Sequence, residues 1–202
     1  MNRGPLQTLA IALASVALFA TVGLAPNAAR ANEGVENDGS DFARTGWYLQ
    51  GSGVFGVSAY RDRRGEVDNS TGANFRLGYR ANTFAALEVE LEWIDRFTEE
   101  LGGSEPANFR SYVFGANGKA YMAEGRFQPF GIVGVNVMNV KTRDAALGSD
   151  GNADWAFRMG GGLDVYATRH VAVSLEATYV WGVGDVWSRD YTSIGGGLLY
   201  RF

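Results

Sequence analysis

The feature of this sequence that most restricts its fold is an alternation of apolar and polar residues with a period of two. It recurs in eight runs, at about 46–57, 72–81, 84–95, 108–122, 127–140, 153–166, 171–182 and 190–202. A period of two is typical of strands with one apolar and one polar face. Each run has about ten residues or more, the length that a tilted strand needs to cross a bilayer. An even number of such strands predicts an all-β, eight-stranded antiparallel up-and-down transmembrane barrel.

The connections between the runs alternate in length. Short turns are expected around Asn82, at 123–126 and at 167–169. Longer polar loops are expected at 58–71, 96–107, 141–152 and 183–189. Short turns at one end and long loops at the other are typical of outer-membrane barrels. This arrangement places both chain termini and the short turns in the periplasm and four loops on the outside.

Two closed barrels fit the alternation, and they differ in which strand face points inward. A soluble lipocalin-like barrel has its apolar face inside, whereas a membrane barrel turns that face to lipid. Aromatic residues gather near the predicted strand ends, in two bands that match interfacial girdles and favour the membrane barrel. The outer band comprises Phe55, Trp93, Phe109, Trp155, Trp181 and Tyr191, and the periplasmic band comprises Trp47, Tyr79, Tyr121, Phe130, Tyr200 and Phe202.

The polar strand faces carry charges that nearly balance. The charged residues are Arg76, Arg80, Glu88, Glu90, Glu92, Lys119, Arg158, Asp164, Glu176 and Arg201. The inside of an eight-stranded barrel is just wide enough for side chains to fill it. Because an unpaired buried charge is costly, we expect these side chains to form an interior network of ion pairs and not an open pore. A turn centred near Asn82 would place Arg76 opposite Glu88, and Arg158 is expected close to Glu176.

The residues before the barrel form two further segments. Arg3, the apolar run 9–24 and the small residues Ala29 and Ala31 make the pattern of a secretory signal, so residues 1–31 are predicted to be a cleaved signal peptide. The polar, acidic stretch 32–44 is interpreted as a flexible N-terminal segment, and residues 45–202 as the outer-membrane barrel domain.

Four segments resemble the small outer-membrane β-barrel families, namely the OmpA-like transmembrane domain, OmpX and porin-like barrels. They are GWYLQGSGVFGV (46–57), PFGIVGVNV (129–137), WAFRMGGGLDVYA (155–167) and YTSIGGGLLYRF (191–202). The last segment resembles the terminal signal read by the barrel assembly machinery, with Ile194, Leu198, Tyr200 and Phe202 on one face. The resemblance implies a monomer in the bacterial outer membrane, in contact with outer-membrane lipids and lipopolysaccharide.

The sequence offers little chemistry. Cys is absent and His170 is the single histidine, in a predicted turn, so a thiolate metal site and a Ser-His-carboxylate nucleophile are not expected. We therefore expect no enzyme activity, no cofactor and no bound metal, and the net charge of -4 does not favour nucleic acid as a partner. The leading hypothesis is a structural and surface-interaction role for a barrel that presents four loops. The alternatives are a narrow channel for ions or small solutes and a soluble lipocalin-like binder.

Overall fold

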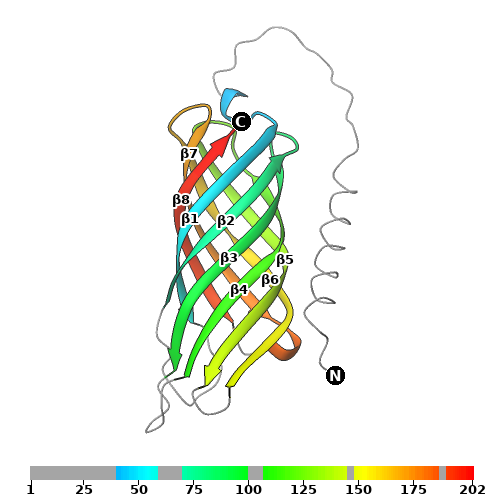
Figure 1. Cartoon of the computed structure of the whole chain (residues 1–202). Helices are drawn as coiled ribbons and strands as arrows, with labels where there is room; N and C mark the ends of the chain where they lie inside the picture. The colour runs from blue at the N-terminus through cyan, green and yellow to red at the C-terminus, as the bar shows by residue number, and fades with distance from the viewer. Residues whose placement is uncertain (1–39, 59–69, 100–106, 145–147, 187–189) are drawn as a thin grey trace.

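The computed structural model describes residues 40–58, 70–99, 107–144, 148–186 and 190–202. Within these ranges, eight antiparallel strands form a closed barrel in which each strand pairs with its neighbours in sequence and the last pairs with the first (Figure 1). The strands are β1 (Gly46–Ser58), β2 (Ser70–Arg80), β3 (Ala85–Glu99), β4 (Ala107–Tyr121), β5 (Phe127–Asp144), β6 (Gly148–Tyr166), β7 (Val171–Gly182) and β8 (Tyr191–Arg201). Two short 3-10 helices accompany them, η1 (Ser40–Phe42) and η2 (Gly184–Val186). This topology confirms the fold class predicted from the period-two runs.

The barrel has two unlike ends. At the short-turn end, uppermost in Figure 1, residues 81–84, 122–126 and 167–170 join consecutive strands, and the C-terminus lies beside them. At the opposite, long-loop end, segments 59–69, 100–106, 145–147 and 187–189 lie outside the described residues. The predicted signal peptide, residues 1–31, lies outside them as well. Among the described residues, no helix is long and apolar enough to span a membrane.

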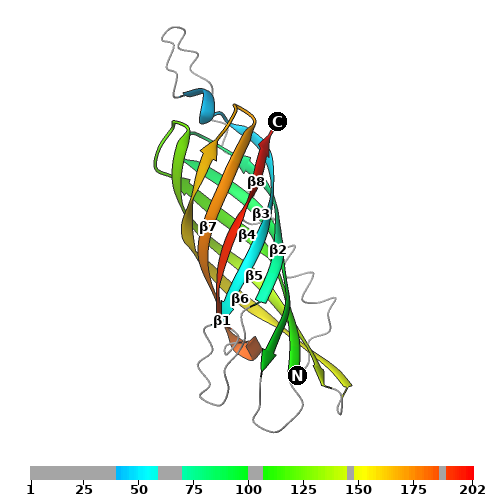
Figure 2. The ribbon, with the colours of Figure 1, turned by 90° about the vertical axis from the view of Figure 1, so that its left-hand side faces the viewer.

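The strands at the long-loop end are longer than the sequence pattern predicts. The loop expected at 141–152 is largely strand, because β5 continues to Asp144 and β6 begins at Gly148. Figure 2 shows this hairpin projecting beyond the neighbouring strands. Backbone hydrogen bonds between strands do not depend on apolar side chains, so pairing continues past the point where the apolar alternation ends.

The inside and the outside of the barrel are inverted relative to a soluble protein. Arg80, Glu92 and Asp164 are fully buried in the interior, whereas Phe75 and Leu198 on the exterior are each 61% exposed. An apolar exterior around a charged interior is the arrangement of a membrane barrel. The structure therefore contradicts the lipocalin-like alternative, which requires the apolar face inside.

Three aromatic residues expected in the interfacial bands lie inside the barrel instead. Tyr121, Phe130 and Tyr191 are all at least 96% buried. They lie near the strand ends, as expected, but their side chains are on the face of the strand that points into the barrel. Bulky interior rings need space, and two glycines supply it. A Cβ on Gly78 would lie 2.2 Å from the ring of Tyr48, and a Cβ on Gly162 would lie 2.6 Å from the ring of Phe130.

Apolar side chains close the interior near both ends of the barrel. The long-loop cluster consists of Ile94, Val113, Met138, Ala156, Val180, Val186 and Tyr191. The short-turn cluster consists of Phe42, Tyr48, Ala86, Tyr121, Phe130, Ile132, Tyr166, Ala172 and Leu199. In each cluster one residue comes from outside the strands, namely Val186 of η2 and Phe42 of η1. Most of the inward-facing charged residues therefore lie between two apolar layers.

The segment 32–44, interpreted from the sequence as flexible, ends in residues that pack against the short-turn end of the barrel. Residues 40–42 form η1, and Phe42 and Ala43 are buried at the short-turn end. The carbonyl oxygen of Phe42 accepts hydrogen bonds from Gln128 and Arg201. Burial of an aromatic ring and two hydrogen bonds to its carbonyl offset the entropy lost on ordering this stretch. Residues 32–39 lie outside the described residues.

Candidate functional site

Eight charged side chains meet in the middle of the barrel interior, and we call this group the ionic belt. Its members are Arg76 on β2, Glu88, Glu90 and Glu92 on β3, Lys119 on β4, Arg158 and Asp164 on β6, and Glu176 on β7. Their side chains are between 0% and 8% exposed. They point inward because side chains alternate between the two faces of a strand, and each of these residues lies on the polar face.

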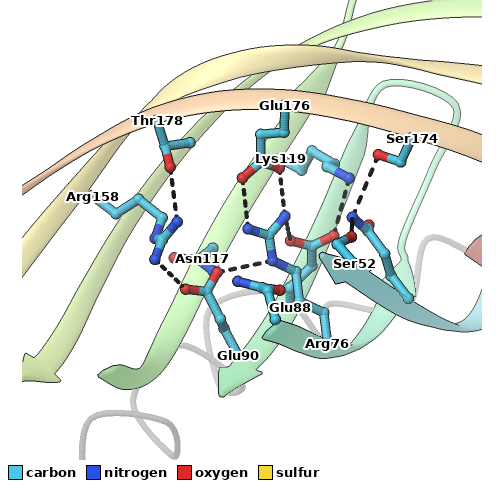
Figure 3. Close-up of polar contacts among 12 residues, drawn as sticks. Ser52, Arg76, Glu88, Glu90, Asn117, Lys119, Arg158, Ser174, Glu176 and Thr178 are labelled. Atoms are coloured by element: carbon cyan, nitrogen blue, oxygen red, sulfur yellow. Dashed lines mark hydrogen bonds and ion pairs between the residues drawn. The ribbon is translucent and has the colours of Figure 1, made fainter. Parts of the chain in front are cut away.

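Arg76 forms ion pairs with three carboxylates of the ionic belt (Figure 3). Its Nη2 donates to Glu176 Oε1 at 2.6 Å, and its Nη1 contacts the other oxygen of that carboxylate. Its Nε donates to Glu90 Oε2 at 2.9 Å, and Nη1 lies 3.7 Å from Glu88 Oε2. Planar, two-point pairing of a guanidinium with a carboxylate is a strong form of charged hydrogen bond.

Two further cations extend the ionic belt toward the two ends of the barrel. Arg158 Nη2 lies 2.7 Å from Glu90 and 2.8 Å from Glu92, and Nη1 donates to Thr178 at 2.8 Å. Lys119 Nζ lies 3.2 Å from Glu88 and 3.6 Å from Asp164. Charges of opposite sign therefore follow one another along the interior, from Glu92 near the long-loop cluster to Asp164 near the short-turn cluster.

The specific pairs expected from the sequence are shifted. The β2–β3 hairpin is centred on Thr83, so Arg76 faces Glu90 in the register, and Glu88 faces Gly78. Moving the centre of a hairpin by one residue moves every cross-strand partner by two. On β6 and β7, Arg158 faces Val180 and Glu176 faces Gly162. The ion pairs of Arg158 cross the interior to β3 instead, which reasoning from neighbouring strands could not reveal.

Two of the ten expected residues, Arg80 and Arg201, lie outside the ionic belt at the short-turn end. Arg80 donates to Gln128 Oε1 at 2.6 Å, and its guanidinium lies 3.9 Å from the centre of the Tyr121 ring. Arg201 donates to the Phe42 carbonyl at 2.7 Å and to the Tyr166 hydroxyl. Both therefore contact neutral acceptors and aromatic rings and brace the short-turn cluster.

Uncharged polar residues complete the network, and two of them, Tyr121 and Tyr191, were expected in the aromatic bands and not in the interior. Tyr48 and Tyr191 donate to Glu88 and Glu92, each at 2.6 Å, and Tyr121 donates to Asp164 at 3.1 Å. Asn74 and Asn117 donate to Glu92 and Glu90. Tyr48 lies on β1, which has no charged residue, and the other four lie on the same inward-facing side of their strands as a charged residue. Sharing a strand face with a charged residue was the signal in the sequence that could have identified these four.

A small cavity lies beside the ionic belt, with room for about one water molecule. It is lined by Gln50, Ser52, Val54, Asn74, Arg76, Glu92, Glu176, Ser193 and Gly195. Side chains fill the interior around it, as expected for a barrel of eight strands.

The remaining sequence candidates lie on the surface. Ile194, Leu198, Tyr200 and Phe202 all point outward and are between 49% and 66% exposed. His170 is exposed in the β6–β7 turn at the short-turn end. Among the residues that the structure describes, no group of three or more His, Cys, Asp or Glu side chains could hold a metal ion. The arrangement in the interior is suited to holding the strands together.

Comparison with known proteins gives a consistent picture. The sequence model of the outer membrane protein beta-barrel domain matches residues 11–202. A search of the curated proteins found no match. The structure is similar to Neisserial surface protein A, with 11% identity and a TM-score of 0.64 over 77% of this chain and 97% of that chain. It is also similar to Ail, the attachment invasion locus protein of Yersinia pestis, with 17% identity and a TM-score of 0.54 over 78% and 99% of the two chains. OprG from Pseudomonas aeruginosa has 13% identity and a TM-score of 0.57 over 80% and 98%.

Proposed function

From the premise that this chain belongs to the outer membrane protein beta-barrel domain family, and is therefore a protein of the bacterial outer membrane, we propose that it is a sealed structural barrel. Its interactions with the surroundings are made by the four segments at its long-loop end, and the short-turn end faces the periplasm. Its exterior contacts outer-membrane lipids and lipopolysaccharide, and it functions as a monomer.

The filled interior is the observation that carries this proposal. The ionic belt lies between the long-loop cluster and the short-turn cluster, and the cavity beside it has room for about one water molecule. A conducting barrel needs a continuous aqueous path, for which this packing leaves little space. A packed interior is what a rigid scaffold needs when its binding chemistry is carried by the loops.

The long-loop end supplies the chemistry for surface interaction. The segment 58–71 contains Arg61, Arg63 and Arg64 together with three acidic residues, and it joins β1 to β2. One protein with the same fold, Ail, is named for attachment and invasion. These features support a surface role, and anionic groups such as lipopolysaccharide phosphates are suitable partners for clustered arginines.

Labelling of single cysteines tests the orientation, because the chain has no cysteine of its own. Asn69→Cys, in the segment 59–69, is expected to react with a membrane-impermeant maleimide on intact cells. Ala167→Cys, in the exposed β6–β7 turn, is expected to react only after the outer membrane is permeabilised. Reaction of both variants, or of Ala167→Cys alone, on intact cells would contradict the proposed orientation.

Two measurements separate the proposed role from a channel. The refolded barrel is expected to show no steady conductance in planar bilayers, and sustained openings altered by Glu90→Ala would favour the channel instead. In a deletion strain, the full chain is expected to restore surface binding and membrane integrity. A variant with a short turn in place of residues 59–69 should restore membrane integrity but not surface binding. If this variant also restores binding, the first long-loop segment has no part in the interaction.

We also propose that the C-terminal strand is read by the barrel assembly machinery during biogenesis. Phe202 is 66% exposed and Phe127, at the same end, is 65% exposed, so the two make a matched pair. Phe202→Ala is expected to lower the amount of protein in the outer membrane severalfold, while Phe127→Ala leaves it unchanged. Equal effects of the two variants, or impaired refolding of Phe202→Ala in vitro, would show a structural role instead.

A further inference from the structure

Residues 40–43, which we call the N-terminal strap, lie across the mouth of the barrel at its short-turn end (Figure 1). The strap comes just before β1, yet the partners of its Phe42 carbonyl are on other strands. This oxygen accepts from Gln128 Nε2 on β5 at 2.9 Å and from Arg201 Nη1 on β8 at 2.7 Å. In the closed order of the eight strands, β5 is the strand farthest from β1. The strap therefore reaches from one wall of the mouth to the opposite wall.

The side chains of the strap contact two of the short turns. The ring centres of Phe42 and Tyr166, at the end of β6, are 5.9 Å apart, and the guanidinium of Arg126 in the β4–β5 turn lies 5.2 Å from the centre of the Phe42 ring. Asp41 pairs with Arg169 in the β6–β7 turn at 2.6 Å. These partners belong to separate strands and turns, which come together only when the barrel closes. The strap is therefore expected to dock last.

Far fewer contacts hold the strap than hold a strand of the barrel. Each strand pairs with two neighbours, whereas η1 joins no sheet. The strap depends on the buried Phe42 ring and on the two hydrogen bonds to one carbonyl. The pair of Asp41 and Arg169 contributes little, because its side chains are 38% and 63% exposed. Segments with few buried contacts open at a lower free-energy cost than the whole fold.

Opening of the strap changes the mouth of the barrel as well. Gln128 Nε2 keeps two other acceptors, the carbonyl oxygens of Glu124 and Gly125. Arg201 is 1% exposed, and its Nη1 loses the Phe42 carbonyl when the strap leaves. Leaving a buried charged donor without an acceptor is costly, so water must then enter the mouth in place of the carbonyl. The docked strap therefore takes the place of water at this end of the interior.

We propose that the N-terminal strap is a lid on the short-turn mouth, which docks on the closed barrel and opens while the barrel stays folded. The open state exposes the guanidinium of Arg201 and the short-turn cluster to water. This inference is independent of the surface role, because it concerns the short-turn end alone.

Cysteine labelling measures the opening of the strap, because the chain has no cysteine of its own. Ala43 is 4% exposed in the strap, and the nearby Thr45 is exposed. The variants Ala43→Cys and Thr45→Cys are refolded in detergent micelles and treated with a maleimide. Unfolding of the same samples is followed by the gel shift of the unboiled protein. Ala43→Cys is expected to react at least about tenfold more slowly than Thr45→Cys, and at least about tenfold faster than the barrel unfolds.

Two substitutions within the strap, each added to Ala43→Cys, make a matched pair. Phe42→Ala removes the buried ring and should bring the labelling rate close to that of Thr45→Cys, while the unboiled protein still migrates as a folded barrel. Asp41→Asn removes only the exposed pair and should raise the labelling rate less than about fivefold.

Several results would overturn the proposal. Labelling of Ala43→Cys as fast as Thr45→Cys would mean that the strap is not docked, and labelling only as fast as the barrel unfolds would mean that the strap does not open separately. Equal effects of Phe42→Ala and Asp41→Asn, or loss of the folded band in Phe42→Ala, would also contradict it. If Ala43→Cys does not refold, amide hydrogen exchange in the natural sequence decides. Faster exchange in the strap than in β5 supports the lid, and equal exchange refutes it.

Discussion

Replacing Arg76 by methionine is the sharpest test of the ionic belt. Met has a similar length and no charge, so Arg76→Met removes the guanidinium with little change in volume. Glu90 keeps Arg158 at 2.7 Å and Glu88 keeps Lys119 at 3.2 Å. Most of the cost therefore falls on Glu176, since both of its oxygens accept from Arg76. Breaking a buried ion pair by removing one partner costs about 3–5 kcal/mol, and we expect a loss of about 4 kcal/mol in the free energy of unfolding.

The measurement is equilibrium unfolding by urea in lipid vesicles, followed by the fluorescence of the five tryptophans. Arg110→Met is the control, because Arg110 pairs with Asp95 at 3.1 Å on the exterior, where the two side chains are 43% and 42% exposed. An exposed pair of this kind contributes less than about 1 kcal/mol. The double variant Arg76→Met/Glu176→Met removes the stranded carboxylate and should regain about half of the loss.

Two results would refute this reasoning. In the first, Arg76→Met costs no more than Arg110→Met, which would mean that water or a proton relieves the carboxylates in the interior. In the second, the double variant is less stable than Arg76→Met alone, which would mean that packing and not charge determines the loss.

Three further predictions concern residues outside the ionic belt, and the same unfolding measurement checks each. Gly78→Ala places a Cβ 2.2 Å from the Tyr48 ring and should cost about 1–3 kcal/mol, and the same change should cost less when it is made in a chain that already carries Tyr48→Ala. Phe42→Ala should cost about 3 kcal/mol because it removes a buried ring from the short-turn cluster, whereas Asp41→Asn, in an exposed pair with Arg169, should cost less than about 1 kcal/mol. Leu175→Lys places a charge on the lipid-facing side of β7 and should cost about 2–4 kcal/mol in vesicles; no loss there would contradict a lipid-facing exterior.

The fold was readable from the sequence because membrane barrels impose one strong rule on every strand. Lipid on one side and a narrow polar interior on the other force a period of two, which persists from β1 to β8. The strand limits at the short-turn end follow from the same rule. At the long-loop end the strands extend beyond the lipid, so this rule no longer applies. The alternation of apolar and polar residues therefore did not predict the extension of β5 and β6.

The sequence predicted which charged residues lie in the interior, but not which of them contact one another. Nine of the ten charged residues expected inside the barrel are buried there, and the tenth, Glu176, points inward with a side chain that is 8% exposed. Cross-strand neighbours depend on the hairpin centre, and the turn at Thr83 places Glu90 and not Glu88 directly opposite Arg76, although Arg76 also lies 3.7 Å from Glu88. Contacts across the interior, such as Arg158 with Glu92, depend on the curvature of the closed barrel, which a linear pattern does not encode. The phase of Tyr121 and Tyr191 was missed because aromatic residues suit both an interface and a packed interior.

The ionic belt has a consequence for how this protein reaches its final state. Glu90 contacts Arg76 on β2, Asn117 on β4 and Arg158 on β6, so no single hairpin contains all of its partners. A β2–β3 hairpin that entered the bilayer alone would carry Glu92 into hydrocarbon without the cation that it contacts, which lies on β6. We therefore expect most strands to insert together and the barrel to close with these charges already paired.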